Sequence, residues 1–402
     1  MSPYPHVPTR SIRVFDTTLR DGEQAPGNAM TPDQKVELAL AIEATGVDTI
    51  EAGFPGSSPS DFEAIRLSAQ ELTTAKLSTL NRAVREDISL AAEAGGIDHH
   101  IQIMATGSDV HLEHKRGLTR SEGLKEIVDS IRFARELGFT DISLAIEDAS
   151  RGTDDLLRPL IEAGVEEGAR TVVLADTTGC RIPSEFGAQV ARVRSWIHDE
   201  ITLSVHCHQD LGLSLANSLA GIEAGADEVQ STLAGIGERA GNTPLEELAA
   251  VLLYKGELLG ATSRLHTQKL YDAYMVLSRI IGIMTPRNKA IFGDNAFATQ
   301  AGIHQAGMLR NPVTYEYVEP HLFGRERGIL IGRHSGRSVI RNMFDQMGLG
   351  VERELLDEIY DTYITGREDG TCIALSELRR IVTERLQRPA APVLSAEFAV
   401  SA

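Results

Sequence analysis

The chain has 402 residues, of which 42% are hydrophobic and 24% charged, and its formal net charge is -18. This length exceeds that of a usual single core, so we expect one large domain and something smaller. The composition is ordinary for a globular protein. The acidic balance argues against nucleic acid or an anionic membrane as partner, because both reward clustered Lys and Arg.

Cysteine usage and the N-terminal residues indicate the compartment. Cys180, Cys207 and Cys372 are too few and too scattered for a disulfide framework or a Cys-rich zinc site. Residues 1–10 hold three prolines and no apolar run, unlike a signal peptide. No run of about 18 apolar residues predicts a membrane span. We therefore expect a cytoplasmic protein.

The first part of the chain alternates β-rich runs with amphipathic segments. One helix is predicted to start at Thr31, followed by Pro32 at the first helical position, and to end at Gly46. Apolar runs such as Thr171–Ala175 are typical of parallel strands buried on both faces. The predicted strands are Ile12–Asp16, Thr49–Phe54, Leu77–Asn81, His100–Ala105, Ile142–Ile146, Thr171–Ala175, Thr202–His206 and Glu228–Leu233.

Eight strands separated by eight helices predict a (β/α)8 TIM barrel. A doubly wound sheet shares the same repeat and is the competing interpretation. We favour the barrel because of the count of eight and because of the site described below. The rhythm changes after Thr262, where a mainly α-helical C-terminal extension begins.

Five regions are predicted along the chain. Residues 1–10 form a flexible N-terminus and residues 11–262 the catalytic barrel. Residues 263–345 form a linker or subdomain, residues 346–387 a small helical subdomain, and residues 388–402 a loose tail.

His206 and His208 stand at the end of the seventh predicted strand. Residues i and i+2 of a strand face the same side, so both imidazoles should converge at the C-terminal mouth of the barrel, where such enzymes place their sites. Asp21, just past the first strand, is the natural third ligand of a divalent metal. A structural His pair is the alternative, and Cys207, facing the other way, is expected to pack in the core.

The loop from Gly235 to Asn242 follows the eighth strand and is rich in glycine. Such a loop lets backbone N–H groups approach an anion, although it can also be a tight turn only. Its spacing and position differ from those of a dinucleotide fingerprint, so we do not expect NAD.

Polar residues end two further strands, Glu147 on the fifth and Thr177 on the sixth. Strand-end residues of a barrel belong to the site more often than not, although either could cap a helix. Arg20, beside Asp21, could stabilise an oxyanion next to the metal, or could form an ion pair with Asp21 or Glu51.

These residues resemble the family that includes 2-isopropylmalate, homocitrate and citramalate synthases. The likeness spans about Ser11 to Arg341. It rests on the following motifs: Phe15–Gln24, Ile50–Pro55, Glu147–Arg151, Ala175–Gly179, His206–Gly212, Gly235–Asn242, Gly302–Gln305 and Gly332–Gly336.

The resemblance implies condensation of acetyl-CoA with a 2-oxo acid, followed by thioester hydrolysis. It implies a divalent metal (Mg, Mn, Zn or Co) held by Asp21, His206 and His208, with Asn242 nearby or ligating. Arg20 would stabilise the alkoxide. Glu147 and His304 would take part in removing a proton from the acetyl methyl group, and Tyr315 would assist electrostatically. Residues placed in the 2-oxo acid pocket are Gln24, Glu51, Gln102, Ser143, Ala145 and Thr177.

The resemblance also implies a homodimer, in which residues 263–345 cross to the partner and bring His304 and Tyr315 to its site. A leucine-binding regulatory domain is not seen after the helical region, so we expect no leucine feedback.

Three positions depart from the family patterns and leave the 2-oxo acid open. Ser143 stands where homocitrate synthases carry Arg, and Ala145 and Gln102 stand where leucine-pathway enzymes usually show Ser and His. Gln102 and Ser143 would suit a small polar or anionic substrate, such as oxaloacetate, phosphonopyruvate or pyruvate. The positive charge that an anionic substrate needs could come from the basic segment after the fourth strand, which contains His111, His114, Lys115 and Arg116. The alternative is that this segment is a solvated loop.

Two other functions were weighed. A carbon–carbon lyase like 3-hydroxy-3-methylglutaryl-CoA lyase shares a similar barrel, but the segment with His304 and Tyr315 argues against it. A non-catalytic binding protein is disfavoured because every candidate ligand and Glu147 are present.

Overall fold

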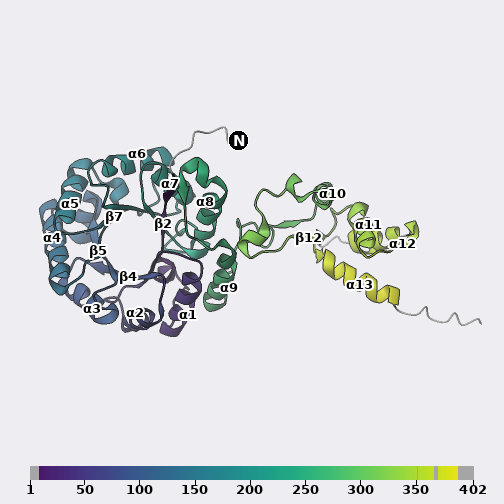
Figure 1. The fold of residues 1–402 in the computed structure, drawn as a ribbon, viewed down its shortest axis with the longest axis horizontal. Coiled ribbons are helices and arrows are strands. Elements are labelled where there is room, and N and C mark those ends of the chain that lie inside the picture. Colours follow the sequence, from purple (N-terminus) through teal and green to yellow (C-terminus); the bar gives the residue numbers. More distant parts are fainter. Residues whose placement is uncertain (1–8, 351, 366–369, 388–402) are drawn as a thin grey trace, which may run out of the picture. The chain divides into compact units, whose positions relative to one another are not determined.

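Eight parallel strands close into a barrel in the first part of the chain (Figure 1). The computed structural model describes residues 9–350, 352–365 and 370–387. Each strand pairs with the next, and the last returns to the first, which confirms the predicted TIM barrel over a doubly wound sheet. The strands are β2 (Arg13–Asp16), β3 (Thr49–Gly53), β4 (Lys76–Arg82), β5 (His100–Thr106), β6 (Ile142–Glu147), β7 (Thr171–Asp176), β8 (Thr202–Cys207) and β9 (Glu228–Ser231).

A ring of helices covers the outside of the barrel (Figure 1). Short π-helical or 3-10 turns follow several strands, among them η1 (Thr18–Gly22), η2 (His111–Arg116), η3 (Ala149–Arg151) and η4 (Leu233–Gly235). The helices are α1 (Pro32–Glu43), α2 (Pro59–Glu71), α3 (Arg85–Gly95), α4 (Arg120–Leu137), α5 (Asp154–Glu166), α6 (Pro183–Arg194), α7 (Ser214–Glu223) and α8 (Leu245–Leu259).

Helix α1 begins where the sequence predicts it. The Thr31 side chain accepts a hydrogen bond from the Gln34 backbone, and the Gln34 side chain accepts one from the Thr31 backbone. This reciprocal capping box, with Pro32 at the first position, satisfies N–H groups that the helix leaves free. Gly46, at a φ of 81°, turns the chain into β3.

Alternation along each strand separates the core from the barrel interior. On β5, Ile101 and Ile103 face outward into the main hydrophobic cluster, whereas Gln102 and Met104 line a cavity inside the barrel. Cys207 also belongs to the outer cluster, as expected, and burial raises the pKa of its thiol. The alternation of side chains along a strand therefore decides which polar residues face the barrel interior.

The barrel unit extends beyond the predicted boundary at residue 262. Strand β1 (Arg10–Ser11) pairs with β10 (Ala261–Thr262), and α9 (Leu270–Ile281) packs on α1, with an ion pair between Arg279 and Glu37. A 3-10 turn, η5 (Thr267–Lys269), precedes α9. The chain forms two compact units. The first contains the barrel, up to Gly293, together with His321–Arg325. The second contains Asp294–Pro320 and the described residues from Glu326 onward. The predicted flexible N-terminus and loose tail lie almost wholly outside the described residues.

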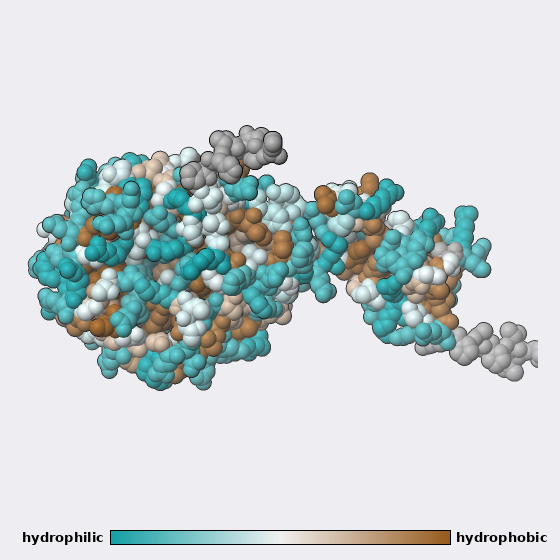
Figure 2. All heavy atoms as spheres, in the orientation of Figure 1, coloured by the Kyte–Doolittle hydropathy of each residue, from teal (hydrophilic) through white to brown (hydrophobic). Residues whose placement is uncertain are grey.

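The second unit has its own core and a small sheet in the order β11-β12-β13. The predicted division at residue 345 falls inside α11, which packs with α12 and α13 in one cluster. Hydrophobic residues gather on its surface around α10 and β12 (Figure 2). Its elements are β11 (Ala298–Thr299), α10 (Gly302–Arg310), η6 (Pro312–Thr314), β12 (Gly328–Ile331), α11 (Arg337–Gln346), α12 (Arg353–Tyr360), η8 (Asp361–Thr365), β13 (Ile373–Ala374) and α13 (Leu375–Gln387). The turn η7 (Pro320–Phe323) belongs mostly to the barrel unit.

Within the described ranges, the helices are too short or too polar to cross a bilayer.

A buried lysine connects two loops at the mouth of the barrel. Lys35 of α1 is 1% exposed, and its ammonium contacts the carboxylates of Glu23 and Asp61. Asp61 in turn accepts hydrogen bonds from the backbone of Phe54 and the hydroxyl of Ser57. The segment after β2 and the segment after β3 are thus held to one cation.

Replacing Lys35 with Met should lower the free energy of unfolding by about 3 kcal/mol, because two largely buried carboxylates lose their partner. Lys269→Met is the matched control, since Lys269 pairs with Asp272 at an exposed surface and should change stability little. Urea unfolding followed by circular dichroism measures both. Equal effects of the two substitutions would contradict a structural role for Lys35.

Candidate active site

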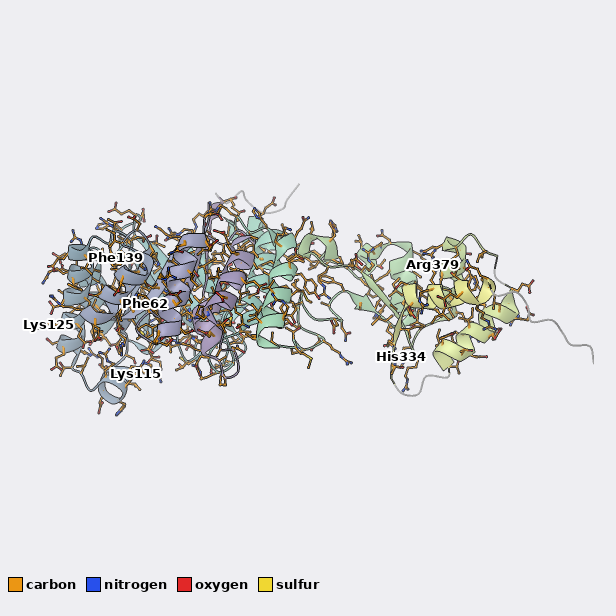
Figure 3. The ribbon with its side chains drawn as sticks, turned by 90° about the horizontal axis from the view of Figure 1, so that it is seen from below. Phe62, Lys115, Lys125, Phe139, His334 and Arg379 are labelled. Carbon is orange, nitrogen blue, oxygen red and sulfur yellow. The ribbon has the colours of Figure 1, made fainter. Side chains whose placement is uncertain are left out.

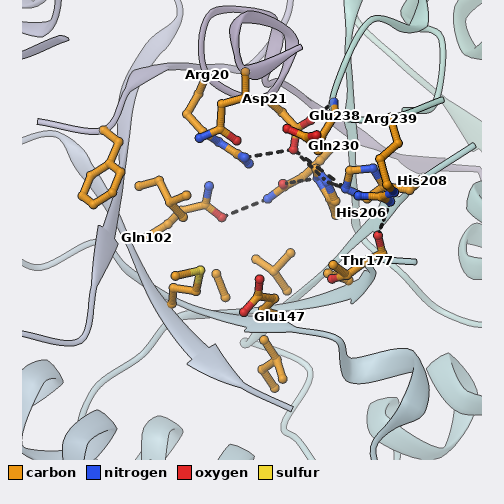
Figure 4. A pocket seen from close by; sticks show the side chains of 18 of the residues that line it. Arg20, Asp21, Gln102, Glu147, Thr177, His206, His208, Gln230, Glu238 and Arg239 are labelled. Atoms are coloured by element: carbon orange, nitrogen blue, oxygen red, sulfur yellow. Dashed lines mark hydrogen bonds and ion pairs between the residues drawn. The ribbon is translucent and has the colours of Figure 1, made fainter. Parts of the chain in front are cut away.

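A cavity of about 300 Å³ opens among the carboxyl ends of the barrel strands (Figure 4). Its polar side carries the charged and imidazole groups, and its other side is largely apolar. The lining residues are Arg20, Asp21, Gln24, Phe54, Leu80, Gln102, Met104, Lys115, Ala145, Ile146, Glu147, Val173, Ala175, Thr177, His206, His208, Gln230, Glu238 and Arg239.

Asp21, His206 and His208 converge on one point of this cavity, and all three are buried. The Asp21 Oδ2 atom lies 3.6 Å from Nε2 of His206 and 3.8 Å from Nε2 of His208. The two Nε2 atoms are 3.1 Å apart. Such separations suit ligands around a single ion with bonds of about 2.1 Å. Two imidazoles and a carboxylate with open positions fit a divalent transition metal and can also serve Mg.

The protonation of these groups favours a cation. Burial opposes ionisation of Asp21, but the Arg20 guanidinium and the two imidazoles hold the pKa of this carboxyl well below its usual range. Burial, with His206 beside it, lowers the pKa of His208 to about 4 against the opposing effect of Asp21. At neutral pH the site therefore holds a carboxylate and a neutral His208 imidazole, whose lone pair can bind a metal.

The loop after β9 supports the carboxylate from the other side. The Asn242 Nδ2 group donates to Asp21 Oδ1 over 2.9 Å, and the Glu238 backbone N–H donates to the same oxygen over 3.1 Å. The Asn242 Oδ1 atom is buried and lacks a hydrogen-bond partner among the described residues. A Cβ at Gly237 would lie 2.0 Å from Asn242 Nδ2, so the loop needs glycine there. Asn242 supports Asp21 without lining the cavity itself.

Turn η1 presents Arg20 and Asp21 because Asp16 anchors its start. Asp16 ends β2 and accepts hydrogen bonds from the backbone N–H and the hydroxyl of Thr18. Burial raises the pKa of Asp16 to about 7 despite these bonds. The π-helical turn then places two consecutive charged residues at the mouth of the barrel.

Arg20 joins Asp21 to Glu51, so the ion pairs weighed from the sequence are both present. Its Nη1 donates to Asp21 Oδ2 over 2.9 Å and its Nε to Glu51 Oε2 over 2.6 Å. These two carboxylates, against the effect of burial, raise the pKa of Arg20. Glu51 is fully buried on β3 and reaches the site through Arg20 and Gln102 rather than by lining the cavity.

Glu147 and Thr177 stand at the mouth on β6 and just after β7. Both Glu147 oxygens accept from the Lys115 ammonium, at 2.6 and 2.7 Å. Lys115 lies on η2, a turn that projects from the barrel (Figure 3). The Thr177 hydroxyl accepts the backbone N–H of Asp148 over 2.8 Å, which leaves its own hydrogen free to donate into the cavity.

The rest of the basic segment is divided between site and solvent. His111 lies 3.5 Å from Glu147, His114 is exposed, and Arg116 pairs with Glu126. His111 and Lys115 therefore lie beside Glu147, whereas His114 and Arg116 lie away from it.

The structure separates the predicted pocket residues by depth. Gln24, Gln102 and Ala145 line the cavity. Ser143 lies deeper in the barrel, where its hydroxyl bonds His100 over 2.6 Å and does not reach the described cavity wall. The contact of Ser143 with substrate stays a prediction.

His304 and Tyr315 belong to the second unit, where their ring centroids are 4.3 Å apart. Glu238, Arg239 and Gln230 line the cavity but were not singled out from the sequence. Gln230 could have been found, because alternation along β9 directs it to the same side as the residues that face the barrel interior.

A divalent metal should raise the melting temperature, because it binds only the folded site. At a hundredfold excess over Kd the stabilisation is roughly 2.7 kcal/mol, which EDTA should remove. Asp21→Asn should abolish most of the shift with Mn²⁺, whereas the surface substitution Asp272→Asn should preserve it. Differential scanning fluorimetry compares the three proteins, and an undiminished shift in Asp21→Asn would exclude this ligand set.

Family models match both parts of the chain. Residues 11–277 match the HMGL-like model, and residues 291–367 match the homocitrate synthase post-HMGL domain-like model. Solved lyases share the fold: a hydroxymethylglutaryl-CoA lyase of Pseudomonas aeruginosa has a TM-score of 0.60 at 19% identity, covering 69% of this chain and 96% of that chain.

Curated relatives are similar over most of the chain. A protein of Methanopyrus kandleri, provisionally named an (R)-citramalate synthase, is 39% identical over 95% of this chain and 74% of its own length. A 2-isopropylmalate synthase of Xanthomonas axonopodis pv. citri is 39% identical over 94% and 71%. One of Sediminispirochaeta smaragdinae is 40% identical over 87% and 71%. The chain therefore belongs to the HMGL-like family, in the branch of the 2-isopropylmalate and citramalate synthases.

Proposed function

We propose that this enzyme condenses acetyl-CoA with a 2-oxo acid and hydrolyses the thioester, giving a 2-substituted malate and CoA. The observation that carries the proposal is the Asp21, His206 and His208 cluster, set beside Arg20 and Glu147 in one cavity. The names of the curated relatives support the same reaction class.

The metal, when bound, polarises the carbonyl of the 2-oxo acid and neutralises developing negative charge. Asp21, His206 and His208 would hold it, with Asn242 positioning Asp21. Arg20 keeps further N–H donors beyond those used for Asp21 and Glu51, and these can stabilise the alkoxide. The Thr177 hydroxyl can donate to the substrate carboxylate.

Glu147 is the candidate base for the acetyl methyl group. It lines the cavity at the mouth, and Lys115 orients both of its oxygens. The resulting enolate carbon attacks the 2-oxo carbon, forming the new C–C bond, and water then attacks the thioester carbonyl and expels CoA as its thiol. Proton transfer by a positioned carboxylate typically contributes 10²–10⁴-fold.

We further propose a homodimer in which His304 and Tyr315 complete the partner's site. The surface that bears them is apolar and exposed, with Ile303 at 77%, Val313 at 78% and Tyr315 at 51% exposure. Apolar side chains exposed together favour an interface. A second copy of the chain is the occupant that the family relationship supports.

The 2-oxo acid that fits best has a short, uncharged side chain. Lys115 is paired with Glu147, and Arg239 with Asp210, so the described cavity wall offers no unpaired cation for a distal carboxylate. Arg20 is paired as well. Much of the remaining wall is apolar and includes Leu80, Met104, Ala145 and Val173. Pyruvate and 2-oxoisovalerate match this wall better than 2-oxoglutarate, oxaloacetate or phosphonopyruvate.

Detection of free CoA thiol tests the reaction directly. With Mn²⁺ and acetyl-CoA, pyruvate or 2-oxoisovalerate should give the highest rate among these five acids, and EDTA should abolish it. Glu147→Gln should lower kcat by about 10²–10⁴-fold, because the base is lost. If none of the acids releases CoA, the condensation is contradicted, and cleavage of a hydroxyacyl-CoA would instead show a lyase.

Mixed dimers test the crossing of subunits. Asp21→Asn and His304→Ala chains should each be nearly inactive alone. A 1:1 mixture after subunit exchange should recover about a quarter of wild-type activity, because about half of the dimers are mixed and one of the two sites in each mixed dimer is intact. Asp21→Asn mixed with Glu147→Gln is the control and should recover nothing, since both residues lie in the same barrel. Equal results for the two mixtures would contradict a shared site.

A further inference from the structure

A continuous chain of hydrogen bonds crosses the barrel interior from Glu51 to His206. Figure 4 shows its part from Gln102 through Gln230 to His206. Gln102 Nε2 donates to Glu51 Oε1 over 2.5 Å. Gln230 Nε2 donates to Gln102 Oε1 over 3.0 Å, and Gln230 Oε1 lies 2.9 Å from Nδ1 of His206. The members come from β3, β5, β9 and β8, and every one is buried.

The direction of this chain is set at the Glu51 end. The Glu51 carboxylate is paired with the Arg20 guanidinium, so it accepts hydrogen bonds. Gln102 must therefore turn its NH₂ toward Glu51 and its oxygen toward Gln230. An amide carries one donor end and one acceptor end, so Gln230 must do the same in its turn.

The consequence reaches the imidazole. The oxygen of Gln230 faces Nδ1 of His206, so this nitrogen must carry the proton. The lone pair is then on Nε2, the atom that faces Asp21 and His208. The Nδ1 of His208, by contrast, is buried without a partner in the described part of the chain. Of the two imidazoles, only His206 has a hydrogen-bond partner on Nδ1 among the described residues.

We propose that Glu51, Gln102 and Gln230 form a relay that fixes His206 as the Nδ1–H tautomer and so presents Nε2 to the metal. Gln230 is a positioning residue in this relay, because it acts through His206. A partner on the second nitrogen of a metal-binding histidine also holds the ring orientation, and its loss typically weakens metal affinity 10–100-fold. The inference rests on the proposed metal role of His206.

The first measurement is the tautomer in metal-free protein. In chain labelled with ¹⁵N-histidine, the cross-peak pattern of His206, assigned by its loss in His206→Ala, should show a proton on Nδ1. Gln230→Leu should shift this signal toward the Nε2–H form or a mixture. Glu51→Gln keeps the size of the side chain but lets the amides of Gln102 and Gln230 reverse their orientation, so it should also yield a mixture of the two His206 tautomers. An Nδ1–H signal unchanged in both variants would overturn the relay.

The second measurement is Mn²⁺ affinity by calorimetry. Gln230→Leu should weaken binding 10–100-fold, and Glu51→Gln should weaken it less. Gln189→Leu is the matched control: Gln189 is buried on α6 and bonds the Ala149 carbonyl, away from the relay, so its affinity should match wild type.

The outcomes separate the two hypotheses. Wild-type protein that binds no Mn²⁺ would refute the proposed metal site. The tautomer of His206 in metal-free protein would still show whether the relay exists. Metal binding with equal affinity in Gln230→Leu and wild type would overturn the relay and leave the proposed function standing. Should Gln230→Leu fail to fold, Glu51→Gln decides, because it conserves volume.

Discussion

Closure of the barrel by the pairing of β9 with β2 is the constraint on which the site depends. Four residue pairs, from Arg13 with Glu228 to Asp16 with Ser231, join strands more than 200 residues apart. This pairing brings the loop after β2 against the loop after β9, so that Asn242 supports Asp21. Without closure, the carboxylate and the two imidazoles would stand at opposite edges of an open sheet.

Pairing of each buried cation with carboxylates lets many ionisable groups lie together at the mouth of the barrel. Arg20 is placed between Asp21 and Glu51, and Lys35 between Glu23 and Asp61, so each buried cation meets two carboxylates. Unpaired burial of any of these charges would cost several kcal/mol. The excess negative charge at Asp21 and Glu51 is also what a divalent cation at the imidazoles would offset. The same arrangement therefore limits the cost of burial and leaves a negative charge that a divalent cation would offset.

The periodicity of the sequence predicted the features that depend on a single strand or helix. Contacts between elements far apart in the sequence could not be predicted in this way. The strand count, the start of α1 and the common face of His206 and His208 follow from spacings within single elements. The contact of Gln102 with Gln230 joins residues 128 apart and depends on how β5 and β9 face each other across the barrel. The attachment of α9 to α1 likewise rests on tertiary contacts, so the change of rhythm after Thr262 did not reveal the boundary near Gly293.

The inward-facing residues of one strand lie at different depths below the mouth of the barrel. On β6, Glu147 stands at the mouth, Ala145 lies one inward position deeper on the cavity wall, and Ser143 lies deeper still against His100. A short side chain at the lowest position cannot reach the cavity, whereas a long one there could extend upward along the wall. Whether a side chain at position 143 lines the cavity therefore depends on its length. With Ser143 turned to His100, Ala145 and Gln102 are the residues of these positions that line the cavity, and in the proposed reaction they would set its width and polarity for the 2-oxo acid.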